Sequence, residues 1–378
     1  MTNNLSLNDI VQHFAPGWFA SVMGTAVIAV AIFVFRLFVP FAAIAQGVLL
    51  AFAVVLFAVL IIPWVLRWIH HPDSARRDLN NPVSAAFFPT MPISLLVIGI
   101  ALEKTAPAFL PEATLWAILQ TLWVFGSAGI LVFALVLITI FIEKPEVKWE
   151  SSTLGWLIPP VSALLIPVLG LSLAGHYVGT TWGTVTLFGS LLFLGAGTVL
   201  FILILAMVFN RYIFYPQPPV HLAPTLWVGL APTSILAITA LRLVKPLKAA
   251  LGFSIQTEET LNVLMQVGSV ALWGFALFWL ALAVTLTLRT HRRMPLPFAL
   301  SWWAFVFPMG AFTVSTGVIY QTFPLDFFLW IGLTGLAALL ILWLITVVRT
   351  LQGAFKGTIF LPHASPASVQ TEATQPGH

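Results

Sequence analysis

The chain has 378 residues, of which 60% are hydrophobic and only 7% are charged, and its formal net charge at pH 7 is +4. A soluble globular protein carries about 25% charged residues, so the composition excludes that class and indicates a protein of the lipid bilayer. The absence of cysteine excludes a disulfide framework and a thiolate metal site.

Ten apolar segments follow one another along the chain, each of about 20 residues or more and long enough to cross the hydrocarbon of a bilayer. We expect them at residues 16–35, 42–66, 83–102, 113–142, 153–174, 181–209, 223–241, 260–288, 297–318 and 326–348. The sequence therefore predicts an all-α integral membrane protein with one ten-helix transmembrane domain over residues 16–350.

The two ends of the chain differ from this domain in composition. Residues 1–15 are polar and lack the basic run of a cleaved signal peptide. Residues 351–378 are expected to form a largely disordered tail, because their last part is rich in Ser, Thr, Pro and Gln.

Lysine and arginine are unevenly distributed among the connecting loops, with eleven after the even segments and five after the odd ones. The positive-inside rule then predicts that both termini are cytoplasmic, with the chain in the cell (inner) membrane. One loop is an exception, because Arg242, Lys245 and Lys248 would lie outside. Since the basic residues are scattered among loops, the positive charge does not indicate a nucleic-acid partner.

Proline falls in every other segment. Pro16, Pro89, Pro159, Pro232 and Pro308 lie in the first, third, fifth, seventh and ninth segments, at spacings of 70 to 76 residues. Such a period indicates one structural unit used five times. Because proline kinks a helix, and bent helices in lipid are tolerated chiefly against protein or water, we expect the odd segments to line an interior and the even ones to shield it.

Ionisable side chains are nearly missing from the centres of the segments, where they would be functional candidates. The charged residues that flank the segments can reach the interface instead; they are Arg36, Arg67, Glu103, Glu143, Arg242, Arg289 and Arg349. His176, at the outer end of the fifth segment, is interpreted as an interfacial histidine, with a proton or substrate site as the alternative. No cofactor or metal motif is found, so neither a cofactor nor an enzyme is predicted.

Small polar side chains recur at helical spacing in the odd segments. Hydroxyls four residues apart share one face of a helix and could line a mildly polar conduit. They could equally bond back to their own helix or join neighbouring helices, and the pattern leaves both open. The residues are Ser21 and Thr25, Thr90 and Ser94, Thr233, and Thr313 and Ser315.

An aromatic cluster in the ninth segment ends at Phe307, directly before Pro308. A phenyl ring on the axis of a pore could act as a hydrophobic constriction that gates by dewetting. On these residues alone, ordinary core packing is the favoured interpretation.

Five motifs, in order along nearly the whole chain, resemble the tellurite-resistance/dicarboxylate transporter family, which includes bacterial TehA, malate and sulfite permeases and plant slow-type anion channels. The motifs are Pro16-Gly17-Trp18-Phe19-Ala20-Ser21-Val22-Met23-Gly24-Thr25, Asn81-Pro82-Val83 through Phe88-Pro89-Thr90-Met91-Pro92, Leu157-Ile158-Pro159-Pro160-Val161, Leu230-Ala231-Pro232, and Trp303-Ala304-Phe305-Val306-Phe307-Pro308.

The resemblance implies five helical hairpins around a quasi-fivefold central pore, with proline-kinked odd helices inside and even helices outside, assembled as a homotrimer. It also implies that Phe307 plugs the pore and that Ala20 packs near it. The other pore-lining or kink positions expected from the motifs are Ser21, Met23, Gly24, Phe88, Pro89, Pro92, Pro159, Pro160, Pro232, Thr233 and Pro308.

We therefore expect movement of small, preferably monovalent anions through a pore gated by Phe307. A proton-coupled C4-dicarboxylate (malate) or sulfite transporter is the alternative. The preference for monovalent cargo follows from desolvation, because in an uncharged pore a dianion faces about four times the Born penalty of a monoanion of equal radius. A membrane enzyme or receptor is least favoured, since no convergent set of titratable residues is found.

Overall fold

The computed structural model describes residues 6–143 and 149–360, and within these ranges the chain is helical with no β-strand. Ten helical stretches of this described part are long and apolar enough to cross a membrane. The predictions of an all-α fold and of ten spans are therefore confirmed, and the chain is a multi-pass membrane protein. The stretches are Pro16–Val34, Ala42–His70, Pro82–Ala108, Glu112–Glu143, Leu154–His176, Thr181–Phe214, Val220–Leu251, Ile255–Arg293, Leu300–Thr322 and Asp326–Phe355.

Two sets of helices alternate along the chain, and we call them inner and outer helices. The inner helices are α2 (Ala20–Val34), α6 (Thr90–Thr105), α8 (Ile158–His176), α10 (Leu230–Leu251) and α12 (Trp303–Thr322). The outer helices are α3 (Ala42–His70), α7 (Glu112–Glu143), α9 (Thr181–Phe214), α11 (Ile255–Arg293) and α13 (Asp326–Phe355).

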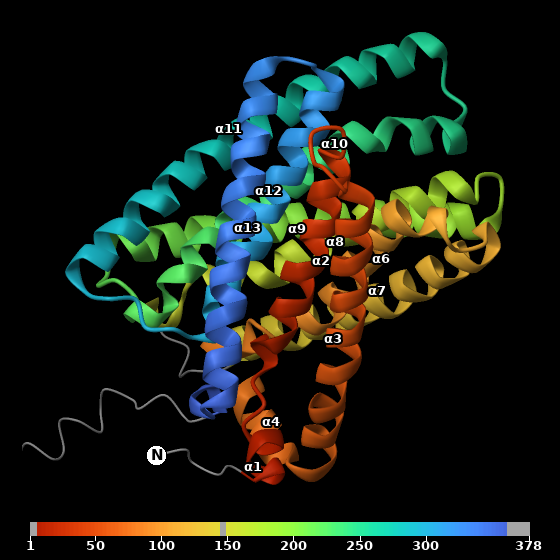
Figure 1. Ribbon diagram of the computed structural model, residues 1–378. Coiled ribbons are helices and arrows are strands. Elements are labelled where there is room, and N and C mark those ends of the chain that lie inside the picture. The colour runs from red at the N-terminus through yellow and green to blue at the C-terminus, as the bar shows by residue number, and fades with distance from the viewer. Residues whose placement is uncertain (1–5, 144–148, 361–378) are drawn as a thin grey trace, which may run out of the picture.

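The inner helices form a closed ring. Between 72% and 94% of the most apolar stretch of each odd span is buried, against 17% to 28% for the even spans. Each inner helix contacts the next one along the chain, and α12 contacts α2. Each outer helix packs against the inner helix that precedes it, as the paired ribbons of Figure 1 show. The odd spans are thus inside and the even spans outside.

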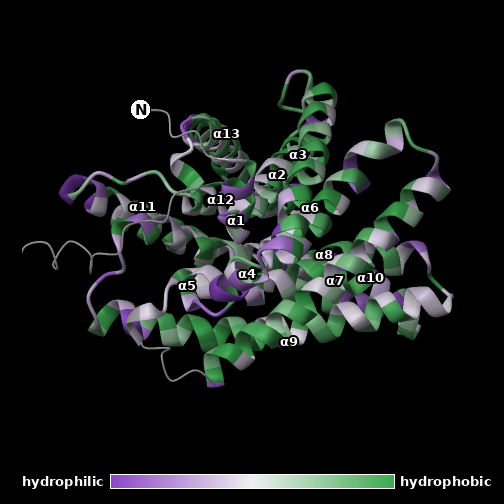
Figure 2. Ribbon diagram, turned by 90° about the horizontal axis from the view of Figure 1, so that it is seen from below, coloured by the Kyte–Doolittle hydropathy of each residue, from purple (hydrophilic) through white to green (hydrophobic). Residues whose placement is uncertain are grey.

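The outer helices present apolar side chains to their surroundings. Leu192 on α9, Val267 on α11 and Trp330 on α13 are among their strongly exposed residues. In Figure 2 the lengths of α3 and α9 are mainly hydrophobic, whereas the short helix α4 (Pro72–Leu79) is hydrophilic. This surface suits contact with lipid chains, and the polar α4 suits the aqueous side.

Each odd span changes helix geometry near its start. Short 3-10 helices lead directly into four inner helices: η1 (Pro16–Phe19), η4 (Leu154–Leu157), η5 (Val220–Gly229) and η6 (Leu300–Trp302). Ahead of α6, the short helix α5 (Pro82–Ala85) and the turn at residues 86–89 take this place.

A proline in the first turn of a helix removes no intrahelical hydrogen bond. Pro16 opens η1, Pro89 is the N-cap of α6, and Pro92, Pro159, Pro160 and Pro232 lie in the first turns of α6, α8 and α10. These prolines therefore mark the starts of the inner α-helices rather than kinks in their middles. Pro308 differs, because it lies inside α12. Proline is also not confined to the odd spans, since Pro63 lies inside α3.

Tryptophans of the outer helices hold the inner ring by hydrogen bonds. In three cases an indole N–H of one outer helix donates to the next inner helix around the ring. The pairs are Trp123 Nε1 to Ile166 O at 3.1 Å, Trp273 Nε1 to Thr316 Oγ1 at 2.8 Å, and Trp343 Nε1 to Thr25 Oγ1 at 3.1 Å.

Arg67 is one of two arginines that are almost completely buried in the described part of the chain. Arg67, near the end of α3, is 3% exposed. It donates to the carbonyl oxygens of Gln12, Phe14 and Ser74 and to the carboxylate of Asp78 at 2.6 Å. The expectation that Arg67 reaches the interface is therefore wrong, because its guanidinium is held by three backbone oxygens and one carboxylate.

The ends of the described chain pack against the ring. The short helix α1 (Leu7–Gln12) contacts α3, and α13 continues to Phe355, beyond the expected boundary at residue 350. The 3-10 helix η7 (Thr358–Phe360) follows, with the Phe360 ring stacked on Trp18 at a centroid distance of 5.6 Å. The remainder of the predicted tail lies outside the described residues.

Candidate anion pathway

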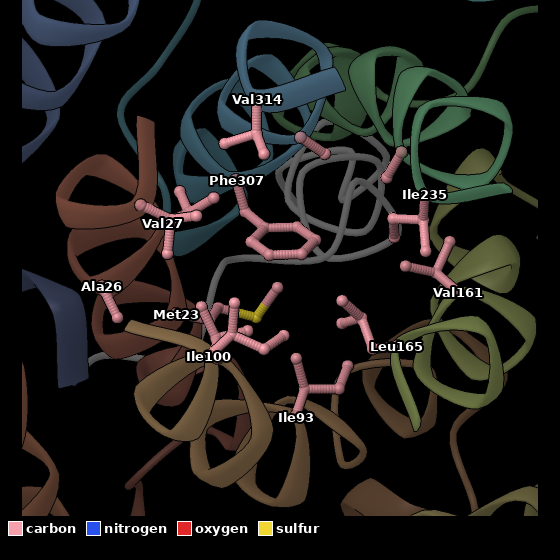
Figure 3. Close-up of a cluster of buried hydrophobic side chains, with 14 of the residues drawn as sticks. Met23, Ala26, Val27, Ile93, Ile100, Val161, Leu165, Ile235, Phe307 and Val314 are labelled. Atoms are coloured by element: carbon pink, nitrogen blue, oxygen red, sulfur yellow. The ribbon is translucent and has the colours of Figure 1, made fainter. Parts of the chain in front are cut away.

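A cavity of about 250 Å³ lies in the middle of the inner ring, and all five inner helices contribute to its wall. Most of its lining is aliphatic, and the charged exceptions are Lys104 on α6 and Arg242 on α10. Figure 3 shows aliphatic side chains from different inner helices turned toward this common centre. The aliphatic lining residues are Val27, Val30, Val34, Val97, Ile100, Leu165, Val168, Ile235, Ile238, Ala311, Val314 and Val318, and Phe33, Phe307 and Gln321 complete the wall with the two cations.

Phe307 borders this cavity from α12. It is the lining residue nearest the start of α12, whereas Gln321 is near the end of that helix. Its side chain is 4% exposed, and in Figure 3 its ring projects into the middle of the helix ring, toward Met23, Ile93 and Leu165.

The other end of the cavity carries three charged side chains that we call the mouth cluster: Glu103, Lys104 and Arg242. Glu103 Oε1 accepts from Lys104 Nζ at 2.7 Å, from Ser172 Oγ at 3.0 Å and from Arg242 Nη2 at 3.4 Å. Arg242 also donates to Val168 O at 3.0 Å and to Ser172 Oγ. The cluster thus joins α6, α8 and α10.

The mouth cluster was not predicted from the sequence. Glu103 and Arg242 were expected to reach the interface, yet Arg242 lines the cavity and the Glu103 side chain is only 12% exposed. The repeat length was a clue to one contact of the cluster. Val168 lies 74 residues before Arg242, about one repeat, and Arg242 donates to its carbonyl oxygen. Of the expected outer cluster, Lys248 pairs with Glu258, and neither it nor Lys245 lines the cavity.

On α2, the expected lining residues divide between two faces. A helix turns about 100° per residue, so Ala20 and Met23 lie within about 40° of the cavity-lining Val27. Ser21 lies about 120° from Val27 and donates to Trp18 O at 2.6 Å. The aliphatic members of the motif therefore face the middle, and the hydroxyl bonds to its own backbone.

The expected hydroxyls on α10 and α12 also lie away from the cavity wall. Thr233, two residues before the cavity-lining Ile235, lies about 160° round α10 from it. Thr313 and Ser315 donate to the carbonyl oxygens of Met309 and Phe312 on their own helix. These three side chains do not line the cavity. Back-bonding describes Thr313 and Ser315, whereas the buried Thr233 hydroxyl has no hydrogen-bond partner in the described part of the chain.

Between α2 and α6, hydroxyls join neighbouring helices. Thr90 donates to Pro16 O at 3.0 Å, and Ser94 donates to Phe19 O at 3.0 Å. These bonds span 74 and 75 residues, one repeat of the chain. They fix the first inner span against the second.

Two further expected lining positions serve packing. Phe88 is fully buried and packs against Trp64, Trp68 and Phe133 of α3 and α7, with centroid distances of 5.3 to 6.2 Å. Gly24 allows α12 to approach α2, because a Cβ at this position would lie 2.9 Å from the Trp303 ring.

His176 lies away from the cavity wall. Its ring stacks on Trp116 at 4.0 Å, and its Nδ1 is 3.9 Å from the carboxylate of Glu112. This is the environment of an interfacial histidine. Among residues 6–143 and 149–360, no group of three or more metal-ligating side chains is found.

Comparison with known proteins adds a family. Residues 13–351 match the family described as SLAC1, voltage-dependent anion channel. An uncharacterized transporter of Methanocaldococcus jannaschii is 32% identical over 94% of this chain and 97% of its own length. A sulfite efflux pump of Arthroderma benhamiae is 23% identical over 84% of each chain, and a putative malic acid transport protein of Schizosaccharomyces pombe is 20% identical over 95% of this chain and 84% of its own.

Proposed function

Because the chain belongs to the voltage-dependent anion channel family, we propose that it moves small, preferably monovalent anions through the middle of the inner ring, with Phe307 as the gate. One observation carries this proposal. A cavity bordered by all five inner helices runs from Lys104 and Arg242 to the Phe307 ring. The relatives are transporters by name, and transport requires no covalent chemistry.

The wall of the cavity explains how a ring can gate. Between the mouth cluster and Phe307, the lining on the five helices is almost entirely aliphatic. A narrow apolar passage holds water poorly, so an aromatic ring in it raises a barrier by dewetting as well as by size. Moving the Phe307 ring aside lowers both barriers.

The same wall favours monovalent cargo. Past the mouth cluster, no charged side chain lines the cavity in the described part of the chain. An anion moving toward Phe307 must therefore leave most of its hydration without a countercharge. Because this cost grows with the square of the charge, chloride, nitrate or bisulfite suits the cavity better than a fully ionised dicarboxylate.

Replacing Phe307 by alanine tests the gate. In liposomes that hold the purified protein, Phe307→Ala is expected to raise the anion conductance several-fold. Phe312→Ala is the matched control, because Phe312 lies on the same helix but stacks on Trp273 of α11 at 5.9 Å. A monodisperse Phe307→Ala protein with the wild-type conductance would remove the gate from the proposal.

We propose in addition that the chain forms homotrimers with one pathway in each protomer, in the cell (inner) membrane and with both termini in the cytoplasm. The loop charges support this orientation, and the apolar faces of the outer helices accommodate both lipid and neighbouring protomers. Native mass spectrometry in detergent measures the number of copies, and a monomer would refute the trimer.

A proton-coupled malate or sulfite transporter is the second candidate, and the names of two relatives favour it. In this case a pH gradient alone should drive anion uptake when the anion concentrations on both sides are equal. Uptake that follows only the anion gradient and the voltage would exclude proton coupling and support the uncoupled pathway.

A further inference from the structure

The mouth cluster combines two cations and one carboxylate, and this combination bears on which anions bind there. We propose that Lys104 and Arg242 form an anion-binding site at the mouth of the cavity, and that Glu103 behind them sets the preference of this site for monoanions. The site is a selectivity element of the proposed pathway, and in this sense the inference rests on the proposed function.

The two cations face the cavity, and the carboxylate does not. Lys104 and Arg242 belong to its lining, and each side chain is 26% exposed. Glu103 is absent from the lining and is 12% exposed. An anion that enters therefore contacts the ammonium and the guanidinium. The carboxylate lies behind these two groups and affects the anion by its negative charge.

Both cations keep donors for a ligand. Lys104 directs one of its three ammonium donors to Glu103, and no other acceptor for it is found in the described residues. Arg242 is oriented by Val168 O and Ser172 Oγ on α8. Neither cation depends on the anion for its position, so the site is formed before the anion arrives.

Glu103 is held in an unusual way for a carboxylate that only joins helices. Its Oε1 accepts three hydrogen bonds, whereas its buried Oε2 has no partner in the described part of the chain. A buried acceptor without a partner is costly. Glu103 therefore adds negative charge beside the two cations at a cost to stability, as expected for a group kept for its charge.

The charges of the cluster sum to one positive unit, which a monoanion balances. A dianion would leave the site with a net negative charge, and the aliphatic lining beyond it offers no further compensation. Removing the charge of Glu103 would give two positive units and favour the dianion. The electrostatic energy that a dianion gains from this change is twice the energy that a monoanion gains. The affinity for the dianion relative to the monoanion therefore changes by the effect of one unit charge.

The experiment compares Glu103→Gln with the wild type in liposomes, with reversal potentials measured for nitrate and sulfate. The permeability ratio of sulfate to nitrate is expected to rise about fivefold, the effect of one unit charge a few ångströms away in a water-like dielectric. Lys104→Gln removes one positive unit, so it should lower the same ratio and the nitrate flux. Glu258→Gln is the matched control, because Glu258 pairs with Lys248 outside the cavity, and it should leave the ratio unchanged.

Anion-dependent thermal unfolding tests the site without conduction. Nitrate should stabilise the wild type more than it stabilises Lys104→Gln, and sulfate should gain relative to nitrate in Glu103→Gln, with Glu258→Gln correcting for the general effect of sulfate on folded proteins. Wild-type protein without anion flux but with these binding changes would refute the proposed function and keep the site. Wild-type flux with a folded Glu103→Gln protein of unchanged ratio and unchanged stabilisation would refute the site.

Discussion

The inner helices are built differently at their two ends. At their starts, large side chains such as Phe19, Phe88 and Leu157 are fully buried, and 3-10 helices and prolines set the geometry. Toward their ends the same helices carry mostly valine, leucine and isoleucine around a cavity, with three charged residues at its mouth. The starts of the inner helices are therefore tightly packed, whereas their later parts enclose the cavity.

Arg67 and Arg242 make the sharpest contrast between these ends. Arg67 is enclosed by backbone oxygens and Asp78 at the packed end. Replacing it by methionine leaves Asp78 and three carbonyl oxygens without their donor, and we expect a loss of about 3 to 5 kcal/mol of unfolding free energy. Thermal unfolding in detergent measures the loss.

At the cavity end, Arg242→Met is the counterpart of Arg67→Met. Because Arg242 is 26% exposed and lines the cavity, its replacement should reduce anion flux more than it lowers the melting temperature. If the Arg67→Met protein melted at the wild-type temperature, the buried polar contacts of Arg67 would not stabilise the packed end, and the contrast between the two arginines would be wrong.

A smaller loss is expected from Gly229, where η5 ends and α10 begins. A Cβ on Gly229 would lie 2.2 Å from the Trp279 indole, whose Nε1 donates to Leu226 O at 2.9 Å. Gly229→Ala must therefore displace the indole and break this bond, at a cost of about 2 to 3 kcal/mol. Gly274→Ala on α11 is the control, because a Cβ there meets nothing within 4 Å. Equal melting temperatures for the two variants would contradict the dense packing.

Two valines of α12, one on each side of Phe307, allow the packed end and the cavity end to be compared within one helix. Val306 is fully buried, and Val314 borders the cavity. Threonine has nearly the shape of valine but adds a hydroxyl, so Val306→Thr should cost about 1 to 2 kcal/mol of unfolding free energy. Val314→Thr should cost less than half of that, since its side chain borders open space rather than packed neighbours on every side. Identical losses would indicate that Val314 is packed as tightly as Val306.

The same contrast explains which features could be predicted from sequence. The ten spans and their alternation of buried and exposed faces follow from hydropathy and from the prolines, because those residues act locally on helix formation. The detailed role of the prolines does not follow, since a proline in the first turn and one in the middle of a helix look alike in a sequence. Pro232 begins α10, whereas Pro308 lies inside α12.

The candidate site was predicted only in part. Phe307 and Met23 project into the middle of the ring in Figure 3. Ser21 and Thr233 lie on other faces of their helices, where Ser21 bonds to its own backbone and the buried Thr233 hydroxyl has no partner in the described part of the chain. The mouth cluster was missed because its members come from two helices, α6 and α10, and each looks like an ordinary residue at the end of a span. Only the fold brings Glu103 to Arg242, 139 residues later.

The smallest effect is expected at α1, where the packed end meets water. Ser6 and Asp9 form a capping box, and hydrogen bonds from the Ser6 side chain and backbone lower the pKa of Asp9 below 3.8. A lowered pKa means that the cap stabilises α1 above the ordinary pKa, and that this stabilisation is lost as the pH falls through the lower value. Because Asp9 is fully exposed, the melting temperature of the whole protein should hardly change between pH 5 and about pH 3 on its account. Ser6→Ala should return the Asp9 pKa toward its ordinary value in an NMR titration, and an unchanged value would show that the cap does not form in solution.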